Sequence, residues 1–251
     1  MESHKRMLRI LDLFEEHNEG WSAEQLHAVL GYSRSTLYRY LKMLTDSGLL
    51  TSLPGIGYAL GPRIIELDYR IRTGDPLIRA AKPLMQELVK EFPGTALLCR
   101  LYRDKVLCVH QESGSDAFQS KFERGCIRPL SRGAASLIIL ANLPAHRLLR
   151  LQRDNAEEFA KAGLGADLAA VRTGLKKYRQ RGWAETHGQV TPGGTGIAAA
   201  LFDGGNEVHG SLILTTASDG LSEERIRTIA QRVTFYARII SNSLGSTQHK
   251  G

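Results

Sequence analysis

The stretch that most constrains this chain is residues 33–45, where Leu37, Leu41 and Leu44 recur with helical spacing. Ser33 can cap this helix, because its hydroxyl can accept a first-turn N–H, and Gly48 fits the left-handed conformation that ends many helices. The opposite face has no carboxylate and consists of cations and hydroxyls: Arg34, Ser35, Thr36, Tyr38, Arg39 and Lys42. Such a face suits the major groove of DNA, where arginine bridges guanine acceptors and lysine or hydroxyls hold phosphates. The alternative interpretation is an ordinary amphipathic helix whose polar face is in contact with solvent.

The flanking segments favour DNA binding. Residues 22–30 are predicted to form a short helix, which Ser22 caps and Gly31 ends. Downstream, residues 49–53 and 56–60 flank a Pro-Gly turn, so we expect a β-hairpin. In this order the parts make a winged helix-turn-helix. The predicted DNA-binding residues are Ser22, Ser33, Arg34, Ser35, Thr36, Tyr38, Arg39, Lys42 and Tyr58.

Composition indicates a globular, cytoplasmic protein. Of the 251 residues, 42% are hydrophobic and 24% are charged, as is usual for soluble domains. No stretch approaches the roughly 20 apolar residues of a membrane helix, and the first residues lack the apolar core of a signal peptide. Three cysteines without metal-type spacing indicate reduced thiols. We therefore expect no membrane contact.

The net charge of +7 is unevenly distributed along the chain. Residues 1–75 hold nine Lys/Arg and ten Asp/Glu, whereas the remainder holds twenty-four and sixteen. The basic balance therefore lies outside the predicted DNA-binding domain, and only the local charge of the 33–45 helix supports DNA contact. The overall positive charge still favours approach to a polyanion.

The rest of the chain predicts an α+β protein. A helix over 5–16 should pack on the helix-turn-helix, and a helix over 63–72 should link two domains. We expect a winged helix-turn-helix over 1–61, a linker helix over 62–75, an effector-binding domain over 76–245 and a disordered tail over 246–251. In the second domain an antiparallel sheet is expected, with a polar, irregular segment over 113–128. Its predicted helices are 76–92, 133–143, 147–159, 168–181 and 222–244, and its strands are 95–102, 105–111, 183–187, 196–202 and 209–216.

Six segments carry a resemblance to a known family. They are Arg9-Ile10-Leu11, Ser35 to Leu41, Gly57 to Arg63, Arg128-Pro129-Leu130-Ser131, Arg181-Gly182-Trp183-Ala184 and Leu221 to Ile226. In this order they resemble the IclR family of bacterial transcription regulators over nearly the whole chain. The resemblance implies a ligand-responsive repressor or activator with a GAF-like domain that binds a small organic acid. It also implies homodimers built through the N-terminal domain and linker helix, often paired as dimers of dimers, that bind double-stranded DNA.

The effector positions depart from the family pattern. In better-known members an Asp, a Cys and two Ser meet the ligand carboxylate; the aligned positions here are Thr186, Gly196, Ile213 and Thr215. We therefore expect a roomier, less polar pocket at the start of the 133–143 helix, suited to a monocyclic aromatic acid. Its apolar wall is expected from Leu98, Leu101, Val109, Leu137 and Ile213. The predicted effector-binding residues are Ser131, Arg132, Gly133, Ala134, Ala135, Thr186, Gly196, Ile213 and Thr215.

Other chemical motifs are weak. Cys108 and His110 share one face of a strand but lack the partners that a metal site or nucleophile needs, and the glycine-rich run 192–196 lacks the lysine of a phosphate loop. Arginines at 124, 128 and 132 form either a solvated basic edge or an anion site. We predict no catalytic residue, metal or cofactor. The alternatives to a regulator are an enzyme with an appended winged helix and a purely structural module.

Overall fold

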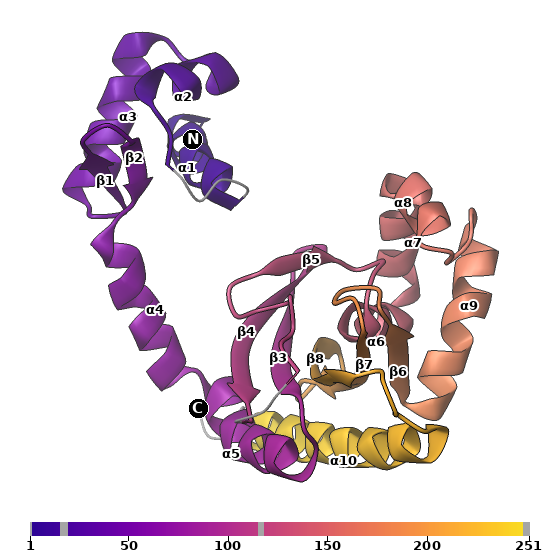
Figure 1. Cartoon of the computed structure of the whole chain (residues 1–251). Helices are drawn as coiled ribbons and strands as arrows, with labels where there is room; N and C mark the ends of the chain where they lie inside the picture. The colour runs from indigo at the N-terminus through magenta and orange to yellow at the C-terminus, as the bar shows by residue number, and fades with distance from the viewer. Residues whose placement is uncertain (1, 16–19, 115–117, 248–251) are drawn as a thin grey trace. The chain divides into compact units, whose positions relative to one another are not determined.

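The computed structural model describes residues 2–15, 20–114 and 118–247. It divides the chain into two compact units, residues 1–74 and 75–251 (Figure 1). The predicted disordered tail lies partly outside the described residues, which end at Thr247, where the last helix ends. At residues 246 and 247 that prediction is wrong, because the helix continues through them.

The first unit is built around three helices and a hairpin. It contains α1 (Glu2–Asp12), a 3-10 turn (Leu13–Glu15), α2 (Ala23–Leu30), α3 (Arg34–Asp46), β1 (Leu50–Leu53), β2 (Gly57–Leu60) and α4 (Pro62–Gly74). Ser22 and Gln25 form a reciprocal capping box at the start of α2, and Gly31 ends it in the left-handed conformation. The buried core is small: Ile10, Leu26, Tyr32, Leu37, Tyr40, Leu41, Leu44 and Leu50.

Two details of this unit differ from the prediction. The first helix ends at Asp12 rather than 16, and a 3-10 turn follows it. Val29 shares helical spacing with Leu26 and Leu30, which predicts an inward position, yet it is 56% exposed. Tyr32 and Tyr40 are buried instead, and their rings pack edge to face at 6.0 Å. A tyrosine in a polar sequence context can thus complete a small core that leucine spacing alone does not predict.

The second unit is a six-stranded antiparallel sheet with helices on both faces (Figure 1). Its strands are β3 (Thr95–Tyr102), β4 (Lys105–Ser113), β5 (Ile127–Pro129), β6 (Trp183–His187), β7 (Gly194–Phe202) and β8 (Val208–Ala217), in the order β5-β4-β3-β8-β7-β6. One face packs on α5 (Pro76–Glu91) and α10 (Glu223–Thr247). The other packs on α6 (Ala134–Asn142) and α9 (Leu168–Arg181), and α7 (Ala145–Asp154) and α8 (Ala156–Lys161) extend the same core away from the sheet.

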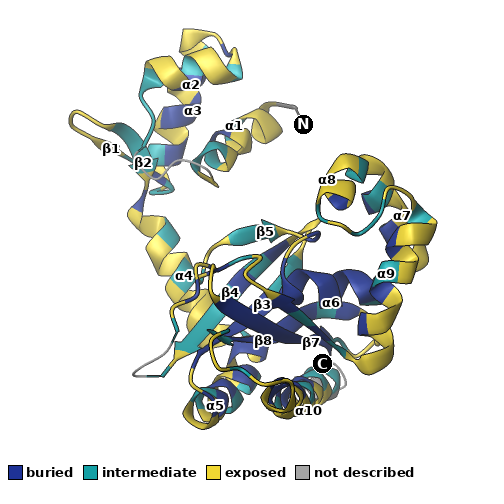
Figure 2. Cartoon of the chain, turned by 45° about the vertical axis from the view of Figure 1, so that its right-hand side comes forward, coloured by how far each residue is buried: buried dark blue, intermediate teal, exposed yellow. Residues whose placement is uncertain are grey.

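The central helix of this unit is α6, which is buried from Ala134 to Ala141 (Figure 2). By contrast, α5 and α10 each bury one side and expose the other (Figure 2). Because side chains alternate along a strand, Leu97 and Cys99 of β3 face α6, whereas Ala96 and Leu98 face α5 and α10. The start of α6 therefore meets only alternate residues of the sheet.

Three elements of the second unit differ from the prediction. The helix expected over 147–159 is two helices, α7 and α8, separated at Asn155, whose φ of −134° is not helical. The three-residue strand β5, at the edge beside β4, lies where irregular chain was expected. The last helix extends to Thr247 rather than 244.

Candidate DNA-binding surface and effector cavity

The solvent face of α3 carries the predicted DNA contacts. Ser33 caps the helix by accepting a hydrogen bond from the Thr36 amide at 3.4 Å, and Leu37, Tyr40, Leu41 and Leu44 bury the opposite face. This burial leaves the predicted contacts outward: Arg34, Ser35, Tyr38, Arg39 and Lys42 are exposed, and Thr36 is half-buried. The face therefore presents three cations and a set of hydroxyls on one continuous helical surface.

The cations of this face are available for a polyanion. Arg34, Arg39 and Lys42 make no ion pair with any residue within the described parts of the chain. The Arg39 guanidinium lies over the Tyr40 ring, 5.5 Å from its centroid. A hydrogen bond from Ser3 at 2.9 Å lowers the pKa of Tyr40, and the positive charges of Arg39 and Arg6 act in the same direction.

The other predicted DNA residues also have structural roles. The Ser22 hydroxyl accepts from the Gln25 amide at 3.1 Å, and the Ser33 hydroxyl donates to Thr36 Oγ1 at 2.9 Å. Tyr58 is half-buried, and its backbone forms two 2.8 Å hydrogen bonds with Trp21, which anchor the hairpin to the helices. These side chains are consequently less free than those of α3.

A cavity lies at the start of α6, where the sequence predicted it. Eight of the nine predicted effector residues line it: Arg132, Gly133, Ala134, Ala135, Thr186, Gly196, Ile213 and Thr215. The ninth, Ser131, is buried nearby and donates its hydroxyl to Glu158 instead of facing the cavity. The remaining lining residues were not predicted: Leu97, Ser120, Phe122, Arg128, Ser136, Gln189, Val190, Thr191 and Gly194.

The first turn of α6 is already partly capped by other side chains. The Gly133 amide donates to Gln189 Oε1 at 3.0 Å, and the Ala134 amide donates to Thr186 Oγ1 at 3.1 Å. Because the first four amides of a helix lack partners within the helix, those of Ala135 and Ser136 are the next donors available. The positive end of the helix dipole favours an anion at this point.

Two arginines extend this positive region. Arg132 donates to the Gln189 carbonyl at 2.6 Å. Arg128 lies over the Phe122 ring at 4.9 Å and donates to the Lys121 carbonyl at 3.3 Å, while its buried Nε has no hydrogen-bond partner. Burial lowers the pKa of Arg128, and the positive charge of Arg132 lowers it further. No carboxylate is among the cavity-lining residues within the described parts of the chain.

The three arginines spaced by four therefore have different positions. Arg128 and Arg132 line the cavity, whereas Arg124 donates to the Val109 carbonyl at 3.1 Å and does not line it. Their spacing in the sequence is compatible with either a solvated basic edge or an anion site. The structure places two of the three arginines where an anion site would need them.

The cavity is smaller than expected. Its volume is about 30 Å³, whereas an apolar cavity that accepts benzene is on the order of 150 Å³. The expectation of a roomy pocket is thus wrong for this conformation, because side chains such as Phe122, Val190 and Ile213 fill the space.

The predicted apolar wall of the cavity is also largely wrong. Leu98 and Val109 pack on the opposite face of the sheet, Leu101 and Leu137 do not line the cavity, and Leu97 takes their place.

The weaker motifs lead to no reactive site. His110 pairs with Glu112 at 2.8 Å, and Cys108 donates to the His110 carbonyl. Among the described residues no group of three or more His, Cys, Asp or Glu could hold a metal ion. In the glycine-rich run, Gly194 lies against Phe118 and Gly193 has a φ of +71°, consistent with a turn. None of the helices in the described parts of the chain is long and apolar enough to cross a membrane.

Comparisons with known proteins match both units. The family model for the bacterial transcriptional regulator IclR C-terminal domain matches residues 72–242, and the IclR helix-turn-helix domain matches residues 3–54. The HTH-type transcriptional regulator BhcR of Paracoccus denitrificans is 26% identical over 98% of this chain and 88% of its own. A crystal structure of an IclR transcriptional regulator from Alicyclobacillus acidocaldarius shares the fold, with a TM-score of 0.81 and 22% identity over 98% and 99% of the two chains. An IclR homologue from Microbacterium hydrocarbonoxydans, crystallised with 4-hydroxybenzoate, has a TM-score of 0.75 and 19% identity over 97% and 99%.

Proposed function

The chain belongs to the IclR family of bacterial transcriptional regulators, and we propose that a small aromatic acid, bound at the start of α6, changes its affinity for operator DNA. It is a transcriptional regulator with a helix-turn-helix DNA-binding domain and an effector domain, and not an enzyme with an appended winged helix. The observation that carries the proposal is the convergence of Arg128, Arg132 and the first turn of α6 on one cavity, whose described lining residues include no carboxylate.

The proposed DNA contacts follow from the surface of α3. Arg39 and Arg34 have exposed guanidiniums that can bridge the O6 and N7 acceptors of guanine. Lys42 and the hydroxyls of Ser35 and Tyr38 are suited to phosphates. Ser22, Ser33, Thr36 and Tyr58 complete the set, chiefly as positioning residues, since their side chains or backbones hold α2, α3 and the hairpin in place.

The proposed effector contacts divide into an anionic and an apolar end. A carboxylate can take the unpartnered Nε of Arg128 and the amides of Ala135 and Ser136, and Arg132 lies close enough to add charge. Leu97, Phe122 and Ile213 provide apolar contacts for a ring. Because the cavity holds only about 30 Å³, we propose that the ligand binds a conformation in which Phe122 has moved aside. The 4-hydroxybenzoate complex of the Microbacterium homologue supports this ligand class.

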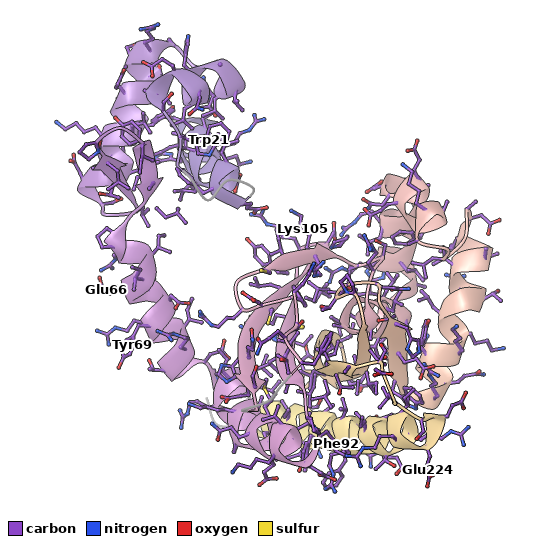
Figure 3. The ribbon with its side chains drawn as sticks, in the orientation of Figure 1. Trp21, Glu66, Tyr69, Phe92, Lys105 and Glu224 are labelled. Carbon is purple, nitrogen blue, oxygen red and sulfur yellow. The ribbon has the colours of Figure 1, made fainter. Side chains whose placement is uncertain are left out.

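We also propose that the chain forms homodimers through α4, which can pair into dimers of dimers. This helix leaves Ile65 71%, Tyr69 56% and Ile71 53% exposed, which is more apolar surface than a solvated linker needs. Glu66 and Tyr69 project from it (Figure 3). A two-fold dimer also matches DNA half-sites about one helical turn apart. Light scattering should give at least a dimer at micromolar concentration; a monomer that still binds its DNA site with wild-type affinity would contradict the proposal.

The test of function uses a DNA site that the wild-type protein selects from a random pool. Its binding is measured by fluorescence anisotropy, with and without 4-hydroxybenzoate, and with pyruvate as the small comparator acid. Arg39→Ala should weaken DNA binding by about 1–3 kcal/mol and relax one base position. Arg128→Gln should leave DNA binding unchanged and lose the response to 4-hydroxybenzoate, since it removes the charged anchor.

The matched controls are Arg9→Ala for the first unit and Arg153→Gln for the second, because both residues are exposed cations away from the proposed contacts. Each should behave as wild type in both measurements. Wild-type DNA affinity in Arg39→Ala would reject α3 as the reading helix. An unchanged 4-hydroxybenzoate response in Arg128→Gln would reject the effector site, and a stronger response to pyruvate would reject the aromatic class.

A further inference from the structure

A second and larger cavity lies at the other end of α6 and β7. Its volume is about 660 Å³, within the range of ligand pockets. It is bounded by the end of α6 at Asn142, the end of β7 at Phe202 and the turn after it, the end of α9 and one side of α10. It shares no lining residue with the effector cavity. Figure 1 shows α9 and α10 on either side of the β6–β7 edge of the sheet.

Two arginines from different helices line this cavity. Arg179 of α9 and Arg238 of α10 are exposed and make no ion pair or hydrogen bond with any residue of the described part of the chain. Arg100 and Arg232 of the same unit are instead paired, with Asp75 and with Glu91, each at 3.0 Å. A cavity with two unpaired guanidiniums is suited to an anion.

The acidic side chain in the lining is already occupied. Asp203 lies in the turn after β7, and its Oδ1 accepts hydrogen bonds from the amides of Gly205 and Glu207 at 2.9 and 3.0 Å. It therefore fixes the turn and does not neutralise either arginine through an ion pair. The positive charge of Arg179 and Arg238 remains available to a ligand.

Uncharged polar groups beside the arginines are also incompletely used. The Thr234 hydroxyl is buried in the cavity wall and has no hydrogen-bond partner, a state that costs free energy unless something fills it. The Asn142 amide nitrogen donates to the Ile138 carbonyl at 2.8 Å, so its oxygen is left as an acceptor. Thr234 and Asn142 together can exchange hydrogen bonds with ligand hydroxyls.

From these observations we propose that the cavity is a second ligand site, which binds a small anion that carries hydroxyl groups. The anionic group lies between Arg179 and Arg238, and the hydroxyls contact Thr234 and Asn142. Aromatic effectors are not favoured here, since Phe202 is the one aromatic residue among the described lining residues. The site is independent of the effector cavity, so its test does not depend on the function proposed above.

Isothermal titration calorimetry of the full chain with two probes and two comparators tests the site. The probes, glucose 6-phosphate and gluconate, each combine hydroxyl groups with one anionic group, a phosphate in the first and a carboxylate in the second. The comparators each have one of the two features: inorganic phosphate has the anionic group and sorbitol has the hydroxyls. At least one of the first two should bind about tenfold more tightly than either single-feature probe. Absence of binding by both at millimolar concentration, or equally tight binding of inorganic phosphate, would overturn the proposal.

Paired variants separate a site from general charge. Arg179→Ala/Arg238→Ala should weaken probe binding at least tenfold, whereas Arg172→Ala/Arg227→Ala removes the same charge from the same two helices outside the lining and should preserve it. An equal loss in both double variants would reject the site. Thr234→Val should fold at least as stably as wild type, since it removes an unpartnered hydroxyl, yet bind several-fold more weakly; unchanged affinity would remove Thr234 from the site.

Discussion

The two proposed binding regions of this protein are built in different ways. The DNA-binding face comes from one helix, α3, whose thirteen residues present both the buried leucines and the exposed cations. The effector cavity takes its lining from β3, from the segment between β4 and β5 that carries Ser120 and Phe122, from the start of α6, and from parts of β6, β7 and β8. A binding surface formed by one helix can be predicted from the helical repeat of its sequence. The shape of a cavity instead depends on how segments distant in the sequence pack together.

The cores below these regions differ in the same way. Among its described residues, the first unit has one cluster of eight buried residues. The second has two clusters, one on each face of the sheet, which meet through the strands. Because small domains bury a smaller fraction of their surface on folding, one lost core contact should matter more to the first unit.

The largest expected effect tests this difference in cores. Leu41 and Leu212 are both fully buried, one in each unit, and each change to alanine should cost about 2–5 kcal/mol. We expect Leu41→Ala to unfold the first unit and abolish DNA binding, while Leu212→Ala leaves the first unit folded. Each unit contains one tryptophan, Trp21 or Trp183, so denaturation of single-tryptophan backgrounds reports them separately. If both changes shifted the same transition equally, the units would not be independent.

Elements set by local sequence were predicted well, and elements set by the packing of distant segments were not. The helix α3 was predictable because its cap, its leucine spacing and Gly48 agree with one another. The break at Asn155 was not, since the segment contains no glycine or proline and the pattern continues across it. Strand β5 has three residues and, among the described strands, pairs with β4 alone, so it is too short to give a periodic signal.

The candidate cavity was predictable in place but not in shape. The family resemblance and the small residues after Ser131 located its floor, and eight predicted residues line it. Its volume depends on Phe122 and Val190, which come from segments with no regular pattern. Leu98 was misplaced by one residue relative to Leu97, and one residue is enough to change the face of a strand.

The next largest effect is expected from a methyl group added inside the effector cavity, which tests how closely its lining residues are packed. A Cβ added at Gly196 would lie 3.1 Å from Ile213 Cδ1 and 3.7 Å from Ala134 Cβ. Gly196→Ala should therefore weaken 4-hydroxybenzoate binding about tenfold, close to the lower end of the usual cost of overpacking. Calorimetry measures the affinity, and anisotropy should show DNA binding without ligand unchanged. Gly174→Ala, which meets no atom closer than 3.6 Å, is the matched control; an affinity loss in both variants would mean that the effect is not local.

The smallest effect concerns the DNA-binding face alone. If Lys42 contacts a phosphate, Lys42→Ala should weaken binding to all sequences alike and lower the slope of log affinity against log salt by about one. Arg39→Ala should instead change preference at one base pair, so Lys42 and Arg39 would be distinguished by their roles. Anisotropy titrations at several salt concentrations, on the selected site and on one-base variants, measure both quantities. A change of base preference in Lys42→Ala with an unchanged salt slope would place Lys42 on a base edge, and the division of α3 into reading and holding residues would have to be redrawn.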